Sequence, residues 1–274
     1  HPVAHSFPTR RSSDLVLSVE LGAEVDVFPL EKYQENTLSL LSEQLVGDGF
    51  RTVVGVGPEA FQFLGAGLSG LPFPTIYTMV LHTQKAGTSS KPECGIPLNI
   101  PVKIQLQRIK AGLPSIKRLG LLYDSAFNTP FSLEALIYAR TLGMEVIPLS
   151  VSSKKEIPKI LRSNWTRIDG LWMIPDQTVI SESIIQYVIK QALFNKRPVI
   201  GYNRFFYESG AALAFVFDYE EIGRQTGHMA VAMIEKGHCG EKPPVFHTWL
   251  NRRVLNRIGL PIPETYGIGV ESGP

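Results

Sequence analysis

The chain has few cysteines, no long apolar run and no block of like charge. Cys94 and Cys239 are the two cysteines among 274 residues, and neither a CxxC pair nor a cysteine–histidine spacing typical of zinc sites occurs. No segment approaches the roughly 20 apolar residues that a membrane span needs. The formal net charge is +2, and basic residues cluster no further than in pairs. These absences argue against a metal site, a membrane span and a nucleic-acid partner, so we expect a small-molecule ligand.

Motifs of catalysis and cofactor binding are also absent or misplaced. The segment Gly65–Gly70 fits GxGxxG, but it follows a predicted helix, and no acidic residue lies about 20 positions later. Gly55–Ala60 follows a predicted strand but lacks the same acidic partner. There is no GxSxG motif, and no histidine lies in an HExxH or triad-like setting. We therefore predict a binding protein without catalytic residues, cofactor or metal.

The cysteines and the first residues bear on the compartment. Two thiols so far apart in sequence are expected to be unpaired, although a disulfide would suit an exported protein. Residues 1–15 contain no initiating Met and no apolar signal core, so we interpret them as a non-native or disordered tail. We expect an export signal and a first strand to lie outside this chain. The protein itself is predicted to be periplasmic or extracellular, either free or lipid-anchored.

Short β-branched apolar runs alternate with segments of helical period from Val16 onward. This alternation is typical of parallel βαβ units, and near-continuous apolar runs such as RLGLLYD favour sheets that are covered on both faces. The predicted strands are Val25–Leu30, Thr52–Gly57, Thr75–Val80, Arg118–Asp124, Glu145–Val151, Gly170–Pro175, Pro198–Tyr202 and Ala211–Phe217. The predicted helices are Gln34–Val46, Pro58–Leu64, Ile100–Ala111, Ser132–Leu142, Lys154–Ser163, Ser181–Phe194 and Tyr219–Lys236.

This pattern predicts an α/β protein of two lobes, each a doubly wound parallel sheet flanked by helices, with the ligand cleft between the lobes. We expect the N-terminal lobe to comprise residues 16–116 plus about 218–240. The C-terminal lobe would comprise 117–217 plus about 241–274. The segment Leu81–Asn99 has no clear period and is expected to wrap the first lobe before the chain crosses near Pro114–Lys117.

Candidate binding residues follow the predicted strands, because open parallel sheets bind ligands beyond the carboxyl ends of their strands. Small, hydroxyl and amide groups there would hold polar atoms, Asp176 would offer a carboxylate to an ammonium group, and aromatic rings would enclose a planar or apolar group. The candidates are Gly57, Pro58, Glu59, Tyr77, Thr78, Tyr123, Ser125, Phe127, Asn128, Asp176, Gln177, Thr178, Tyr202, Asn203, Phe217 and Asp218.

Several of these candidates have an ordinary structural explanation as well. Ser125, Asn128, Asp176 and Asp218 are residue types that cap helix N-termini. Tyrosines that end apolar strands are equally compatible with simple core packing. Both explanations stay open. The binding hypothesis rests on the occurrence of suitable residues after several different strands.

Seven segments of the chain resemble the ABC transporter substrate-binding family that includes predicted tryptophan and tyrosine binding proteins. PDQTVIS followed by ESGAALAFVFDYEEIGRQ carries the strongest resemblance, because order, spacing and residue types match without gaps. The others are VVGVGPEA, PTIYTMV, LPSIKRLGLLYDSAFN, GMEVIPLSVSSKKEIPKIL and LNRIGLPIPE. The chain departs from the family at Leu81-His82, where Asp-Pro is usual, so ligand identity stays open.

The resemblance implies a type I periplasmic-binding fold and the role of solute receptor for an importer. It implies that Ser125–Asn128 and Asp176–Thr178 hold the carboxylate and amino groups of an amino-acid-like ligand. We expect the side chain of this ligand to be aromatic or branched. The lobes would close over the solute by a hinge motion, and the closed monomer would dock on a membrane permease. The alternatives are a sensory ligand-binding domain of a signalling protein and the effector domain of a transcription regulator, because one fold serves several uses.

Overall fold

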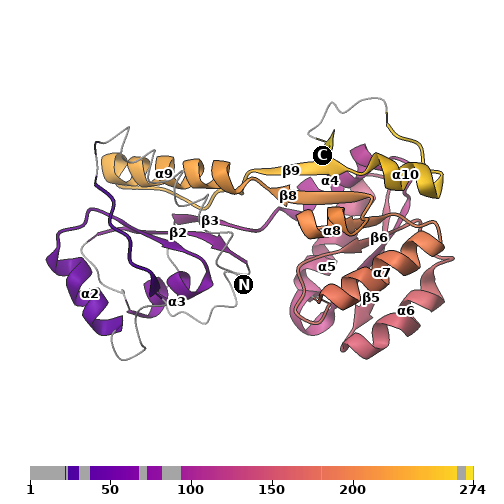
Figure 1. The fold of residues 1–274 in the computed structure, drawn as a ribbon, viewed down its shortest axis with the longest axis horizontal. Coiled ribbons are helices and arrows are strands. Elements are labelled where there is room, and N and C mark those ends of the chain that lie inside the picture. The colour runs from indigo at the N-terminus through magenta and orange to yellow at the C-terminus, as the bar shows by residue number, and fades with distance from the viewer. Residues whose placement is uncertain are drawn as a thin grey trace. The chain divides into compact units, whose positions relative to one another are not determined.

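A computed structural model describes residues 22, 24–30, 38–67, 73–81, 94–179, 181–263 and 270–273. The chain divides into two compact units (Figure 1). Unit 1 comprises residues 1–100 and 217–245, and unit 2 comprises 101–216 and 246–274. The fold class is mixed α/β, as predicted.

Unit 1 contains a three-stranded sheet in the order β1-β2-β3, and both of its pairings are parallel. Its elements are α2 (Leu38–Gly47), β1 (Val53–Val56), α3 (Pro58–Gly67), β2 (Thr75–Val80), β3 (Cys94–Pro97) and α9 (Tyr219–Lys236). The side chains of β2 alternate between two apolar clusters. Ile76 packs with residues of α9, and Tyr77 packs with residues of α2 and α3. The sheet is therefore covered on both faces by residues from its helices.

A disulfide joins the two chain segments of unit 1. Cys94 at the start of β3 bonds to Cys239, which follows α9, across a sequence separation of 145 residues. Next to it, Gly95 forms a parallel bridge with Glu241, and the Lys242 N–H donates to the Gly95 carbonyl at 3.0 Å. The expectation that the cysteines are unpaired was wrong. Their separation in the sequence does not reveal that β3 and the segment after α9 are neighbours in the fold.

Unit 2 is built on a seven-stranded sheet in the order β10-β9-β8-β7-β6-β4-β5. Its helices are α4 (Val102–Gly112), α5 (Ser125–Thr141), η5 (Lys154–Glu156), α6 (Ile157–Asn164), α7 (Glu182–Phe194), α8 (Arg204–Glu208) and α10 (Arg252–Ile258). Its strands are β4 (Arg118–Asp124), β5 (Glu145–Val151), β6 (Gly170–Met173), β7 (Val199–Gly201), β8 (Leu213–Phe217), β9 (Phe246–Leu250) and β10 (Val270–Ser272).

The position of β4 determines where this sheet can bind a ligand. β4 pairs in parallel with β5 on one side and with β6 on the other, so the chain reverses its direction of travel across the sheet after β5. The loops after β4 and β6 consequently leave neighbouring strands at the same edge. Open α/β sheets bind ligands at such a switch point.

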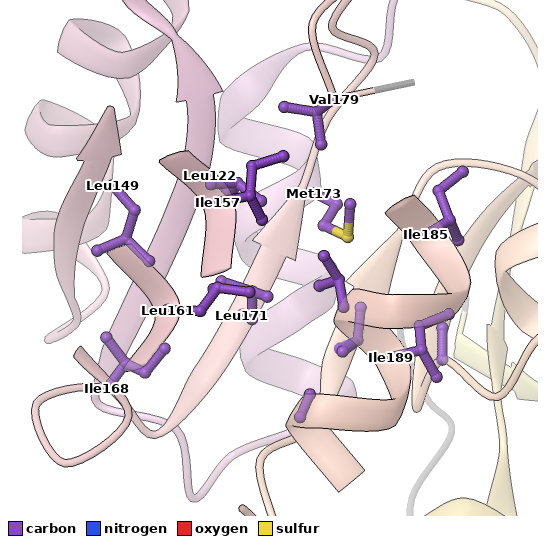
Figure 2. Packing of buried hydrophobic residues seen from close by; sticks show 14 of the residues in the cluster. Leu122, Leu149, Ile157, Leu161, Ile168, Leu171, Met173, Val179, Ile185 and Ile189 are labelled. Atoms are coloured by element: carbon purple, nitrogen blue, oxygen red, sulfur yellow. The ribbon is translucent and has the colours of Figure 1, made fainter. Parts of the chain in front are cut away.

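The core of unit 2 lies against the same three strands (Figure 2). Leu122, Leu149 and Met173 extend from the strands to meet α6 and α7, which contribute Leu161 and Ile189, all of them buried. Leu, Ile, Val and Met supply most of this cluster, whose burial anchors the strand ends that carry the site. Glycine leaves room within the strands where neighbouring side chains approach closely. A Cβ on Gly120, for example, would lie 3.0 Å from both Ile168 and Leu149.

Several elements have the bounds that the sequence predicted, and others differ or were missed. Thr75–Val80, Arg118–Asp124, Glu145–Val151 and Tyr219–Lys236 have the predicted bounds. Val25–Leu30 is not a strand, although Val25, Phe28 and Leu30 still pack against the clusters of unit 1, because an apolar segment can contribute to a core without a hydrogen-bonded ladder. β3, β9, β10, α8 and α10 were not predicted.

Two further predictions differ from the structure. α5 starts at Ser125 instead of Ser132. The first crossing between units falls at Ile100/Pro101, earlier than the predicted Pro114–Lys117, so α4 belongs to unit 2, where it packs against α5 and β10. Most of the aperiodic segment Leu81–Asn99, from 82 to 93, lies outside the described residues, as does the tail 1–15.

Replacing both cysteines with serine should destabilise unit 1 selectively. The disulfide closes a long loop, and its loss is expected to cost about 2–4 kcal/mol. All three tryptophans, Trp165, Trp172 and Trp249, lie in unit 2, so fluorescence reports on that unit while far-UV circular dichroism reports on both. In urea, we expect the dichroism curve of the double variant to show an additional transition at a lower urea concentration. Its fluorescence midpoint should equal that of the wild type. Reductant should reproduce the change in the wild type and leave the variant unaltered. Equal shifts of both signals would contradict this localisation.

Candidate functional site

The candidate site is built at the carboxyl edge of the unit 2 sheet, where β4 ends at Asp124 and the chain after β6 reaches Asp176. Both aspartates are buried, at 3% and 1% exposure respectively. Burying a carboxylate is costly unless its oxygens receive hydrogen bonds. The contacts of these two side chains therefore define the local structure.

Asp176 accepts four hydrogen bonds. Its Oδ2 accepts from the backbone N–H of Asp124 at 2.7 Å and from Asn128 Nδ2 at 2.6 Å. Its Oδ1 accepts from the backbone N–H groups of Thr178 at 2.9 Å and Val179 at 3.2 Å. One carboxylate thus shapes its own loop and also holds the loop that follows β4.

Asp124 also connects the two loops, in this case by accepting a hydrogen bond from the loop after β6. Its Oδ1 caps α5 by accepting from the Ala126 N–H at 2.8 Å, and its Oδ2 accepts from the Thr178 hydroxyl at 2.6 Å. The loops after β4 and β6 are therefore linked by three hydrogen bonds: Asp124 N–H and Asn128 amide to Asp176, and Thr178 hydroxyl to Asp124. All donors to the two carboxylates are neutral groups.

The start of α5 has a kink that suits this linkage. Asn128 has φ −126° and ψ 21°, outside helical values, and Pro130 follows inside the helix. Proline removes a helical N–H, and its ring clashes with the carbonyl four residues earlier, so the regular helical hydrogen bonding is interrupted here. The kink brings the Asn128 amide to Asp176 and leaves a first turn, Ser125–Phe127, in which Ser125 is exposed and Phe127 half-buried.

Two more groups shape the electrostatics of this edge. Glu156, just after β5, accepts from the backbone N–H and hydroxyl of Ser152, and these bonds lower its pKa although burial and the charge of Asp124 act in the opposite sense. The pKa of Tyr202 is raised, mainly by burial and further by the charge of Asp176, so its phenol stays protonated. Glu156 was missed in the sequence because it follows its strand by several residues.

The remaining unit 2 candidates divide into surface groups and supporting groups. Gln177 is exposed, and Thr178 and Tyr202 are half-buried. Tyr202 stacks on Phe206 with ring centroids 4.7 Å apart, and Asn203 caps α8 by accepting from the Phe206 N–H at 3.1 Å. Tyr123 is buried at 7% exposure, in agreement with the packing explanation.

Unit 1 has its own carboxyl edge. Gly57 has φ +95° and donates its N–H to the Thr78 carbonyl at 2.9 Å, and α3 then begins at Pro58 with Glu59 exposed in its first turn. Asp218 caps α9 by accepting from the Glu221 N–H at 2.9 Å. Phe217 is half-buried, with its ring centroid 6.3 Å from that of Tyr219.

Tyr77 and Thr78 have no exposed surface in this structure. The Tyr77 ring packs edge-on against Phe61 at 4.9 Å, and its hydroxyl donates to Glu241 Oε2 at 2.5 Å. A Cβ on Gly95 would lie 2.3 Å from the same ring, so that glycine makes room for it. Tyr77 therefore supports the interior of unit 1 instead of lining a surface.

A shallow hollow in unit 1 lies at the other end of the same sheet. Its lining consists of residues that precede β1 and β2 and residues at the end of α9: Phe50, Arg51, Phe73, Pro74, Met233, Ile234 and Gly237. It contains none of the predicted site residues. Parallel sheets bind ligands at the carboxyl edge, so we assign the site there and not to this hollow.

Two classes of feature are absent from the described part of the chain. No group of three or more His, Cys, Asp or Glu side chains within the described ranges could hold a metal ion. Within the same residues, no helix combines the length and apolar character needed to cross a bilayer.

One family model and one curated relative match this chain. A family model described as ABC transporter substrate binding protein matches residues 24–265. The tyrosine-binding protein of Clostridioides difficile is 28% identical over 178 residues, which is 62% of this chain and 51% of that protein, so the match spans about half of the relative's length.

Two solved structures share the fold. The ligand-free, open structure of a substrate-binding protein with adhesive properties from Clostridium difficile has a TM-score of 0.78 at 22% identity, covering 100% of this chain and 96% of that one. An ABC domain in complex with L-Trp from Streptococcus pneumoniae has a TM-score of 0.62 at 23% identity, covering 98% and 96%. The family match agrees with the prediction that the protein binds a solute and does not act as an enzyme.

Replacing Asp176 with asparagine should destabilise unit 2 strongly. The amide would turn an N–H₂ group toward backbone donors and leave at least one of them unsatisfied, at an expected cost of about 2–3 kcal/mol. Urea unfolding followed by tryptophan fluorescence measures this directly, since all three tryptophans lie in unit 2.

Asp169→Asn provides the matched control. At the opposite edge of the same sheet, the partly exposed Asp169 pairs with Arg118 through Oδ1 at 2.8 Å and accepts hydrogen bonds from the backbone N–H groups of Lys117 and Arg118 through Oδ2. Asparagine can keep its oxygen toward these N–H groups, so the loss should be that of an exposed ion pair, about 1 kcal/mol or less. Equal losses in the two variants would mean that the buried linkage has no special weight.

Proposed function

Because the match over residues 24–265 shows that the chain belongs to the ABC transporter substrate-binding protein family, we propose that it is the extracytoplasmic solute-binding component of an importer and that its solute is an aromatic amino acid. The observation that carries the proposal is the linkage of the two loops at the switch point of unit 2 through Asp124 and Asp176. The relative named for tyrosine binding supports the choice of solute.

The chemistry of the linked loops suits the zwitterionic head group of an amino acid. The first turn of α5, with exposed Ser125, offers the positive end of a helix dipole and a hydroxyl to a carboxylate. The charges of Asp124, Asp176 and Glu156 gather at the ends of adjacent strands and favour an ammonium group nearby.

Asp176 would act on the ammonium group differently from the expectation of direct contact. Its oxygens already accept four hydrogen bonds, and its side chain is 1% exposed. We propose that Asp176 attracts the ammonium group through its charge, and that Gln177, Thr178 and Tyr202 contact the ligand.

Binding would be coupled to closure of the two units. The chain passes between them at Ile100/Pro101, Val216/Phe217 and Val245/Phe246, and a few residues at such connections can absorb a hinge rotation. Closure over the solute would produce the form that docks on the membrane permease. The Cys94–Cys239 disulfide supports an extracytoplasmic location, because disulfides persist in oxidising compartments.

We expect L-tyrosine or L-tryptophan to raise the melting temperature, while sugars and nucleosides leave it unchanged. A ligand at about 1,000 times its Kd adds about 4 kcal/mol of stability, which gives a shift of several degrees. Ser125→Ala should weaken binding by about threefold to tenfold, the effect of one hydrogen bond.

Thr141→Ala, at the far end of α5, is the control, because Thr141 Oγ1 donates only within its own helix, to the Tyr138 carbonyl at 2.8 Å. It should bind as the wild type does. A shift by a sugar and by no amino acid would refute the proposed solute class.

A further inference from the structure

The end of β2 in unit 1 has an unusual backbone. Met79 has φ +63°, a left-handed conformation that side-chain-bearing residues rarely adopt. It also lies at a β-bulge: Thr78 pairs with Ile96 and Val80 with Pro97, so the register between β2 and β3 shifts at Met79. Bulges change the direction of a side chain and occur often beside binding sites.

The bulge moves the Met79 side chain to the other face of the sheet. In a regular strand Met79 would share a face with Tyr77, which packs with α2 and α3. Met79 instead packs against the cluster that contains Ile76 and residues of α9, and Val80 takes the place on the Tyr77 side. Met79 remains half-buried there, and Leu98, Phe217 and Tyr219 are also partly buried against the same cluster.

A second unfavourable feature lies next to the first. The Thr78 hydroxyl is fully buried and has no hydrogen-bond partner. A buried unpaired hydroxyl and a left-handed methionine both cost stability, and glycine or valine would avoid these costs at the same positions. Proteins tend to keep such destabilising features, which the fold itself does not require, at functional sites.

We infer that Met79, together with Leu98, Phe217 and Tyr219, forms the surface of unit 1 that contacts the apolar side chain of the bound amino acid, and that Met79 determines the preference for aromatic side chains. The inference rests on the proposed function. Met79 and Leu98 lie at the carboxyl ends of β2 and β3, the edge at which parallel sheets bind ligands. A thioether adapts its shape and makes favourable contacts with aromatic rings. Phe217 was predicted from the sequence, and the other three residues were not.

Met79→Gly and Met79→Ala test the inference by calorimetry with L-tyrosine, L-tryptophan and L-alanine as probes. Both variants should bind the aromatic amino acids about tenfold more weakly, since a buried methionine contact is lost, and bind L-alanine within about twofold of the wild type. Met79→Gly should melt at a higher temperature than Met79→Ala, because glycine adopts positive φ without strain. The glycine variant therefore keeps the test valid even where the alanine variant folds poorly.

Lys196→Gly is the matched control. Lys196, after α7 in unit 2, is the other described non-glycine residue with positive φ, at +53°. This variant should gain stability and keep both the affinity and the preference of the wild type.

The outcomes separate the two proposals. A wild type that binds none of the three amino acids refutes the proposed function. A wild type that binds L-tyrosine, with Met79 variants that retain the tyrosine-to-alanine ratio, refutes the role of Met79 and leaves the function standing. Equal weakening for all three probes would also refute it, because Met79 would then act only through the fold of unit 1.

Discussion

The buried carboxylate of Asp176 is the interaction on which the candidate site depends. It holds its own loop and the loop after β4 in one arrangement, at the point where the strand order in the sheet of unit 2 changes direction after β5. Both buried carboxylates, Asp124 and Asp176, accept hydrogen bonds from neutral donors only. The same groups therefore fix the geometry of the loops and favour a cationic group at their surface.

The two units contribute different chemistry. Unit 2 presents a polar, charged strand edge with exposed Ser125 and Gln177, whereas unit 1 presents half-buried apolar and aromatic side chains around Met79. An amino acid has the same division between a zwitterionic head group and a side chain. We propose that the hydrogen-bonded edge of unit 2 holds the head group and that the apolar side chains around Met79 in unit 1 set selectivity through the side chain.

Sequence patterns predicted what depends on local periodicity and could not predict what depends on long-range contact. The strand Arg118–Asp124 is a near-continuous apolar run, and in Glu145–Val151 apolar residues largely alternate with exposed ones. The carboxyl-edge rule predicted that Ser125–Asn128 and Asp176–Thr178 lie at one edge, as the hydrogen bond between Asn128 and Asp176 shows. The four acceptor contacts of Asp176 could not be predicted, because they require knowing that β4 and β6 are neighbours. The Cys94–Cys239 pairing, the burial of Tyr77 and the bulge at Met79 arise from tertiary packing in the same way.

The most direct test of the account is calorimetric titration of the protein with L-tyrosine beside tyramine and 3-(4-hydroxyphenyl)propionate, which lack the carboxylate and the amino group respectively. Recognition of the head group by the linked loops predicts that L-tyrosine binds and that each analogue binds at least tenfold more weakly, since charged hydrogen bonds are lost. Binding of either analogue as tight as that of L-tyrosine would contradict the account.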